Sequence, residues 1–205
     1  MDASEYLAFV PLLIYGIGLA DLLGEWKRLF DKSQWFFPYA LFTVILTEVA
    51  VYNIFIYVNL VYELPGQSYF TYLAFLVPPF LFMLTTNVFT PDEGADTKEY
   101  FMKKLPLICI LLALFVGSHF FYSFNEGGNG TDYGRYVSIA IILAAGFSRK
   151  IWLIYLLGVL WITTIFMRGN IVSTPKNQPI QNTQTQVHTD APMTSSTTKN
   201  IAYDF

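Results

Sequence analysis

The sequence predicts an all-α integral membrane protein, a bundle of about six transmembrane helices with a disordered C-terminal tail. Three observations predict this class. Of the 205 residues, 54% are hydrophobic and only 13% are charged, whereas about 25% of residues are charged in soluble proteins. The apolar residues gather in runs of about 20, the length that crosses a bilayer as a helix. The runs are continuous and do not alternate with polar residues as the strands of a membrane β-barrel do.

Six apolar segments are predicted to cross the membrane, within a domain over residues 1–169. They cover residues 7–23, 36–62, 70–89, 105–124, 136–147 and 151–167. We expect the first to be retained, because no basic residue precedes it as in a cleavable secretory signal. Only Ser148, Arg149 and Lys150 separate the fifth segment from the sixth. A single helix across both would bury charge at mid-membrane depth, which is costly, so six spans are favoured over five.

Loop charges predict the orientation through the positive-inside bias. With six spans, one side of the membrane receives eight basic residues close to the span ends: Lys27, Arg28, Lys32, Lys98, Lys103, Lys104, Arg149 and Lys150. The other side receives four, namely Arg135, Arg168, Lys176 and Lys199. We therefore expect the first side to be cytoplasmic and the N-terminus to lie outside the cytoplasm of a bacterial inner membrane. With five spans, the C-terminal tail would change sides.

The structure of the segments outside the spans is predicted from their polarity. Residues 170–205 are rich in Thr, Gln, Asn, Ser and Pro, a composition that buries too little apolar surface to fold, so this tail is predicted to be disordered. The acidic segment over residues 91–99 is interpreted as a solvated turn, capped by Asp96 or Thr97 before a short cytoplasmic helix near Lys98 to Lys104. Gly146 and Gly158 offer small faces for close helix contacts.

Glu48 is the first candidate for a functional side chain. It lies about 12 residues into the second span, close to the bilayer midplane at about 1.5 Å per residue. An ionisable group at that depth indicates a functional site, although a neutral glutamic acid that joins two helices by hydrogen bonds explains it equally well. Tyr52 and Asn59 follow at spacings of four and seven residues and share its helix face. We expect this polar stripe to face the bundle interior.

Pro78 and Pro79 fall in the middle of the third span. Proline removes a backbone donor and clashes with the preceding turn, so the pair is predicted to kink or break the helix. Transporters bind ions and substrates at such breaks, but proline kinks are also common in inert bundles. The two prolines therefore join Glu48, Tyr52 and Asn59 as candidate site residues.

His119 completes the candidate intramembrane polar site. It lies near the outer end of the fourth span, and a titrating role together with Glu48 is considered. No second strong ligand follows it at helical spacing, so no metal site is predicted. Cys109 lies within an apolar run and is interpreted as a small buried hydrophobe.

The sequence excludes several classes of function and leaves two open. A net charge of -3 without a basic cluster argues against nucleic acid as a partner. Because no catalytic or cofactor-binding motif is present, we expect neither an enzyme nor a cofactor. The first functional hypothesis is a small transporter or proton-coupled channel. The alternative is a non-catalytic accessory or scaffold subunit of a membrane complex, whose partners are the lipid bilayer and either another protein or a second copy of the chain.

Overall fold

The computed structural model describes residues 3–60, 68–120 and 131–172, and every regular element in these ranges is an α-helix. The helices are α1 (Ala3–Phe30), α2 (Phe37–Leu60), α3 (Tyr69–Phe89), α4 (Thr97–Ser118), α6 (Thr131–Ser148) and α7 (Ile151–Val172). The predicted fold class is thereby confirmed. α7 continues three residues into the predicted tail, and residues 173–205 lie outside the described ranges, as does the end of the predicted fourth span.

Four of these helices are long and apolar enough to cross a membrane. Their apolar stretches are Phe9–Phe30, Phe37–Tyr57, Tyr69–Phe89 and Thr97–Ser118. α6 and α7 contribute the shorter apolar stretches Tyr133–Ser148 and Ile151–Phe166. The chain is therefore a multi-pass membrane protein built from helices.

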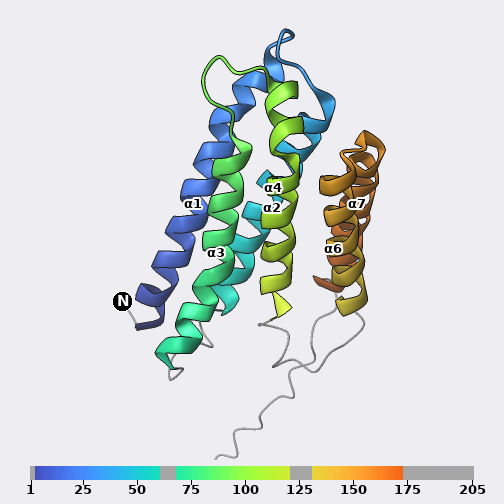
Figure 1. The fold of residues 1–205 in the computed structure, drawn as a ribbon. Helices are drawn as coiled ribbons and strands as arrows, with labels where there is room; N and C mark the ends of the chain where they lie inside the picture. Colours follow the sequence, from blue (N-terminus) through green and yellow to red (C-terminus); the bar gives the residue numbers. More distant parts are fainter. Residues whose placement is uncertain (1–2, 61–67, 121–130, 173–205) are drawn as a thin grey trace, which may run out of the picture.

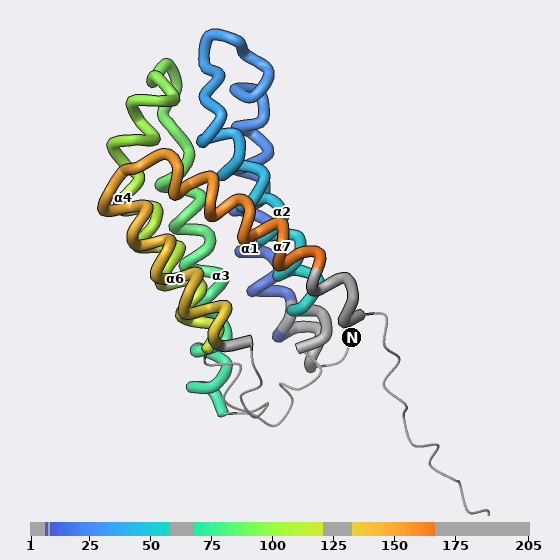
Figure 2. Tube along the Cα trace, turned by 90° about the vertical axis from the view of Figure 1, so that its right-hand side faces the viewer, coloured from blue at the N-terminus to red at the C-terminus, as the bar shows by residue number. Residues whose placement is uncertain are grey.

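The helices form two four-membered rings that share α2 and α4. In the first ring, α1 packs against α2 and α3, and α4 packs against α3. In the second, α6 packs against α4 and α7 packs against α2, so the α6–α7 hairpin lies beside the first ring (Figure 1). Figure 2 shows the hairpin from the side, with α7 running obliquely past α2. α2 and α4, which touch each other only briefly, are the elements that join the two rings.

Aromatic side chains fill the first ring at two levels. Towards one end, Tyr39 stacks on Phe89 with ring centroids 4.5 Å apart, and Phe42 and Phe101 pack around them. Towards the other end, Tyr15 lies 5.4 Å from Tyr57 and 5.3 Å from Phe82. All seven side chains are fully buried. Because both levels are packed, the interior of this ring is closed in the structure.

Glycine sets the close approach of neighbouring helices at three places. A Cβ built on Gly18 of α1 would lie 3.0 Å from Phe82 of α3, and one on Gly158 of α7 would lie 2.9 Å from Leu41 of α2. On Gly146 of α6, it would lie 2.6 Å from the Cβ of Cys109. The prediction that Gly146 and Gly158 serve helix contacts therefore agrees with the structure.

The end of the bundle that carries the α1–α2, α3–α4 and α6–α7 turns is here called the basic end. Asp96 caps α4 there, and its Oδ1 accepts a hydrogen bond of 2.7 Å from the Glu99 backbone N–H. The short cytoplasmic helix expected near Lys98 to Lys104 is not separate, because α4 runs unbroken from Thr97 into the apolar stretch. At the α6–α7 turn, Arg149 adopts a left-handed φ of 52° and ends α6.

Candidate functional site

The candidate site residues predicted from the sequence do not converge on one place. Glu48 and Tyr52 lie on α2, Pro78 and Pro79 are buried in α3, and His119 caps the end of α4. Asn59 belongs to α2, but its side chain lies outside the described part of the structure. Since α2 and α3 stand diagonally opposite in the first ring, Glu48 and the proline pair belong to different surroundings.

Glu48 points away from the aromatic interior. Leu46 is fully buried in the first ring, and two residues further along a helix correspond to a rotation of about 200°. Its neighbours on that side are exposed, namely Val44, Val51 and Phe55. Leu41, which lies about two turns earlier on nearly the same face of α2, packs against Gly158 of α7. Glu48 therefore lies at a seam between the α7 contact and the outer surface.

The face of α2 that lines the first ring is therefore a different one from the face that carries Glu48, and the reason that the sequence does not reveal this is physical. α2 is apolar around its whole circumference, so hydrophobic periodicity does not identify its inner face. The structure shows that the inner face carries Tyr39, Phe42, Leu46, Asn53 and Tyr57. Glu48 itself is half-buried, and its Oε2 is shielded from solvent.

His119 joins α4 to α2 through Asn53, a residue that the sequence analysis did not select. The His119 Nε2 lies 2.9 Å from Asn53 Oδ1, and its Nδ1 lies 2.8 Å from the Phe115 carbonyl. The Asn53 amide in turn donates to the Val49 carbonyl at 2.8 Å. Both imidazole nitrogens thus lie within hydrogen-bonding distance of an oxygen atom. The histidine therefore links α4 to α2, the two helices that both four-helix rings share.

Tyrosine hydroxyls replace the backbone donors that proline lacks. Pro79 leaves the Phe75 carbonyl without its usual donor four residues later, and the Tyr57 hydroxyl of α2 donates to that carbonyl. In α1, Pro11 does the same to Leu7, whose carbonyl accepts a hydrogen bond of 3.3 Å from Tyr72 of α3. The proline pair lies within α3 as predicted, but the helix does not break there. No local pattern in the sequence indicates which tyrosine donates to the Phe75 carbonyl.

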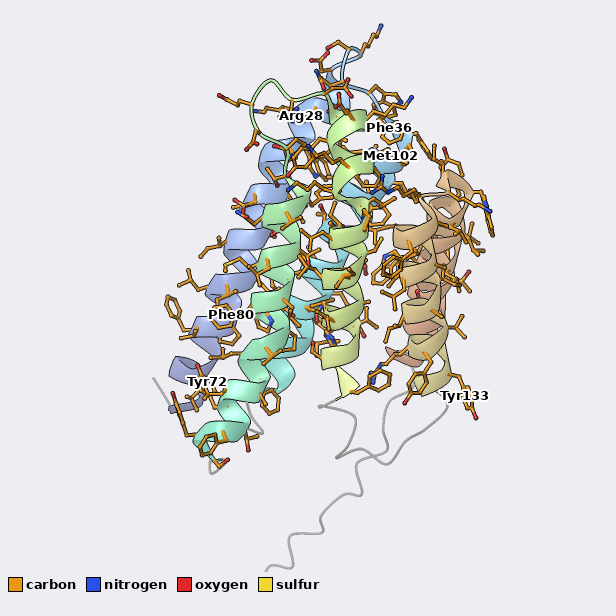
Figure 3. All side chains as sticks on the ribbon, viewed as in Figure 1. Arg28, Phe36, Tyr72, Phe80, Met102 and Tyr133 are labelled. Atoms are coloured by element: carbon orange, nitrogen blue, oxygen red, sulfur yellow. The ribbon has the colours of Figure 1, made fainter. Side chains whose placement is uncertain are left out.

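A buried ionic network fixes the loops at the basic end. Arg28 forms a 2.7 Å ion pair with Glu25, whose carboxylate accepts a 3.0 Å hydrogen bond from Tyr39. Arg28 also donates to the backbone carbonyls of the α3–α4 loop, with distances of 3.2 Å to Pro91, 2.9 Å to Asp92 and 3.2 Å to Ala95. Figure 3 shows Arg28 at this end of the bundle. Arg28 and Glu25 together therefore connect α1 to α2 and to the α3–α4 loop.

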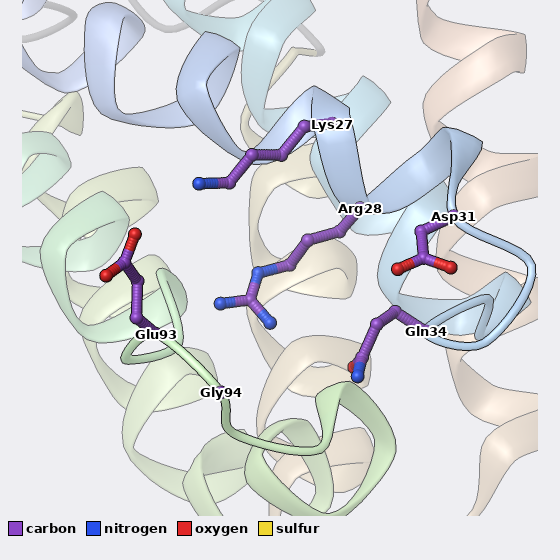
Figure 4. Close-up of a pocket in the computed structure, with 6 residues that line it drawn as sticks. All are labelled: Lys27, Arg28, Asp31, Gln34, Glu93 and Gly94. Atoms are coloured by element: carbon purple, nitrogen blue, oxygen red, sulfur yellow. The ribbon is translucent and has the colours of Figure 1, made fainter.

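Two open pockets lie at the basic end. One, of about 380 Å³, opens between the α1–α2 turn and the α3–α4 loop (Figure 4) and is lined by Lys27, Arg28, Asp31, Gln34, Glu93 and Gly94. The Ser33 hydroxyl and, to a smaller extent, the Ser33 backbone N–H donate hydrogen bonds to the Asp31 carboxylate and lower its pKa. The other, here called the interfacial pocket, measures about 350 Å³ and is lined by Asp21, Asn87, Val88, Thr90, Pro91, Asp92, Tyr100 and Lys104.

Within residues 3–60, 68–120 and 131–172, no three His, Cys, Asp or Glu side chains gather in a way that could hold a metal ion. Cys109 is buried against α6. The polar groups of this bundle instead join helices to helices and loops.

Comparison with known proteins assigns no relative to this chain: no protein-family model, curated protein or solved structure matches it.

Proposed function

We propose that this protein is a non-catalytic accessory or scaffold subunit of a membrane complex, which assembles through the face of α2 that carries Glu48. The observation that carries the proposal is the position of Glu48 at the seam between α7 and the exposed residues Val44, Val51 and Phe55. A carboxyl group close to lipid is costly, and such groups are normally covered by protein.

A partner helix on this face would cover the exposed side chains of Val44, Val51 and Phe55 beside Glu48. A carboxylic acid in its neutral form both donates and accepts a hydrogen bond, so it can pair with a polar side chain of another helix. Tyr52 lies one turn further along and adds a half-buried phenol to the same face. The surrounding valines are small enough for close helix contact. The chemistry therefore suits a transmembrane helix with a polar residue at matching depth, from either another subunit or a second copy.

The packing of the first ring also supports a role without transport. Its interior is filled by aromatic side chains at two levels, and the polar groups Tyr57, Asn53 and His119 are engaged in joining helices. We also propose that the basic end faces the cytoplasm of a bacterial cell, with the N-terminus on the opposite side, since the excess of lysine and arginine follows the positive-inside bias.

The test is site-specific photo-crosslinking in native membranes. A benzophenone amino acid replaces Val51, which lies one turn beyond Glu48 on the outer surface and is 54% exposed. The control replaces Leu114 of α4, which is also 54% exposed. Tyr39 contacts Phe101 and Asn53 contacts His119, which places Val51 level with about Leu114. Positions 51 and 114 thus match in exposed fraction and in depth, and they differ only in the side of the bundle on which they lie.

We expect a defined protein adduct from position 51, strongly reduced by Glu48→Leu, and only lipid adducts from position 114. An adduct of twice the chain's mass would identify a second copy as the partner. If both positions give the same products, or if Glu48→Leu changes nothing, assembly through this face is refuted.

Transport is the second candidate function, favoured by the depth of Glu48 and the burial of its Oε2 within the apolar stretch of α2. In that case Glu48 would carry a proton or bind a cation. Proteoliposomes with a trapped pH-sensitive dye provide the test, with Glu48→Gln as the variant. A proton flux that Glu48→Gln abolishes would favour transport over the scaffold role, whereas an equal, background flux from both proteins would remove this candidate.

A further inference from the structure

We propose that the interfacial pocket binds the phosphoethanolamine headgroup of a membrane lipid, whose acyl chains lie along the outer faces of α3 and α4. This inference does not depend on the proposed scaffold function. It rests on the fixed walls of the pocket, its mixed charge and its depth in the membrane.

The walls of the pocket are held by hydrogen bonds from buried or half-buried side chains. Arg28, which is 8% exposed, donates to the carbonyls of Pro91 and Asp92 and so holds the loop wall in place. On the opposite side, the Tyr100 hydroxyl donates to the Val88 carbonyl at 3.0 Å and fixes the end of α3 against α4. The pocket is therefore formed before any ligand arrives, which reduces the ordering cost of binding.

The charges in the pocket suit a ligand with a positive and a negative end. Asp21 and Asp92 contribute two carboxylates and Lys104 contributes one ammonium, with the Asn87 amide beside them. An ammonium group of the ligand can donate hydrogen bonds to the carboxylates while its phosphate accepts one from Lys104. Two carboxylates disfavour a headgroup that carries only negative charge. A quaternary ammonium lacks the N–H donors that the carboxylates would bind.

The depth of the pocket matches the headgroup layer. Pro106 and Cys109 of α4 contact Gly146 of α6, so the end of α6, with Arg149 and Lys150 directly after it, is close to the level of Lys104. Basic residues at one level are typical of the lipid headgroup region. The first turn of α4 and the α3–α4 loop extend beyond that level, towards the basic end of the bundle.

An apolar surface continues from the pocket towards the membrane interior. On α3, Phe80 (labelled in Figure 3) and Leu84 are exposed and lead to Asn87, and on α4, Leu107 and Leu114 are exposed and follow Lys104. Residues three or four apart lie on the same side of a helix. Acyl chains on this surface would therefore place the attached headgroup at the pocket. The pocket volume of about 350 Å³ lies within the range of about 300–1,000 Å³ for small-molecule sites.

The experiment is native mass spectrometry of the delipidated full chain, titrated with phosphatidylethanolamine, phosphatidylcholine and phosphatidylglycerol of identical acyl chains. We expect phosphatidylethanolamine to bind most tightly. Lys104→Gln and Asp21→Asn should each lower its affinity about tenfold, as expected for the loss of one charge-assisted hydrogen bond. The matched control is Lys103→Gln, which removes the neighbouring exposed lysine outside the pocket. Lys104→Arg, which keeps the positive charge, should retain most of the binding.

Soluble glycerophosphoethanolamine distinguishes a lipid from a free zwitterion. If the ligand is a lipid, the soluble headgroup should compete only at much higher concentration, because it lacks acyl chains. The proposal is overturned if the soluble headgroup binds as tightly as the lipid or if the three lipids bind equally. It is also overturned if Lys103→Gln lowers the affinity as much as Lys104→Gln does, or if Lys104→Arg binds no better than Lys104→Gln.

Discussion

Tyr57 illustrates how a single side chain compensates for an irregularity in another helix. Pro79 deprives the Phe75 carbonyl of its helical donor, and in a bilayer such a group has no water to bind. The hydroxyl of Tyr57 donates to it from α2, across the first ring. Pro79 can therefore remain within a continuous α3 while the Phe75 carbonyl keeps a hydrogen-bond donor.

We predict that Tyr57→Phe destabilises the protein by about 1 kcal/mol, the usual size of a hydrogen bond between membrane helices. The loss should shrink in a Pro79→Ala background, because the new backbone N–H then binds the Phe75 carbonyl. The measurement is a double-mutant cycle of unfolding in mixed micelles with increasing dodecyl sulfate. Tyr69→Phe, at an exposed position, is the control and should have no effect. Equal losses with and without Pro79 would contradict this role of Tyr57.

For single residues, the sequence predicted where a residue lies along a helix better than the face of the helix on which its side chain lies. Pro78 and Pro79 were correctly placed in the third span, but α3 runs unbroken through them, so the break considered from the sequence is not present. The partner of the Phe75 carbonyl and the position of Glu48 beside the α7 contact depend on how α2 is rotated against its neighbours. No local pattern encodes this rotation in a helix that is apolar on every side.

Among the helices, Gly146 makes the tightest contact of the glycines in the described ranges. A Cβ there would lie 2.6 Å from the Cβ of Cys109 and 3.4 Å from the backbone of Pro106. Neither atom lies at the end of a flexible side chain. The α6–α7 hairpin is thus held against the first ring at a position where only glycine fits.

We predict that Gly146→Ala destabilises the protein by about 1–3 kcal/mol, as overpacking usually does. Cys109→Gly should restore part of the loss, because it removes the opposing Cβ. Gly16→Ala is the control, since no atom lies within 4 Å of a Cβ at that position, and it should be neutral or stabilising by up to about 1 kcal/mol. Thermal unfolding in detergent measures all three. A Gly146→Ala protein as stable as the Gly16→Ala protein would show that the contact is not tight.

Helix boundaries differ from predicted span boundaries for a physical reason. Hydropathy marks where a helix enters lipid, whereas capping and packing decide where it begins and ends. α4 begins at Thr97, after the Asp96 cap, although the span predicted from the sequence begins at residue 105. α1 likewise continues to Phe30 beyond its predicted span. These extensions carry Glu25, Arg28 and Tyr100, which form the loop network and the wall of the interfacial pocket.

For the whole molecule, composition and run length were sufficient to predict a helical membrane bundle. They did not predict two rings that share α2 and α4, because apolar helices of this kind can pack with any neighbour. The arrangement follows from contacts between residues far apart in the sequence, including the three glycine contacts and the hydrogen bond between His119 and Asn53. The candidate polar site was dispersed for the same reason: Glu48, the proline pair and His119 take part in three separate helix contacts.

The central claim is that the bundle is closed and that Glu48 lies beside lipid or a partner helix, away from any water-filled path. Cysteine accessibility tests this claim most directly. In a Cys109→Ser background, Val51→Cys reports on the surroundings of Glu48 and Glu93→Cys reports on the exposed α3–α4 loop. A charged, membrane-impermeant maleimide is applied to both faces of the membrane.

We predict that the loop position reacts fully, and that position 51 reacts only after denaturation in dodecyl sulfate. Reaction at position 51 in the intact membrane, at a rate comparable to the loop position, would contradict the account. It would show that water reaches the middle of the membrane beside Glu48.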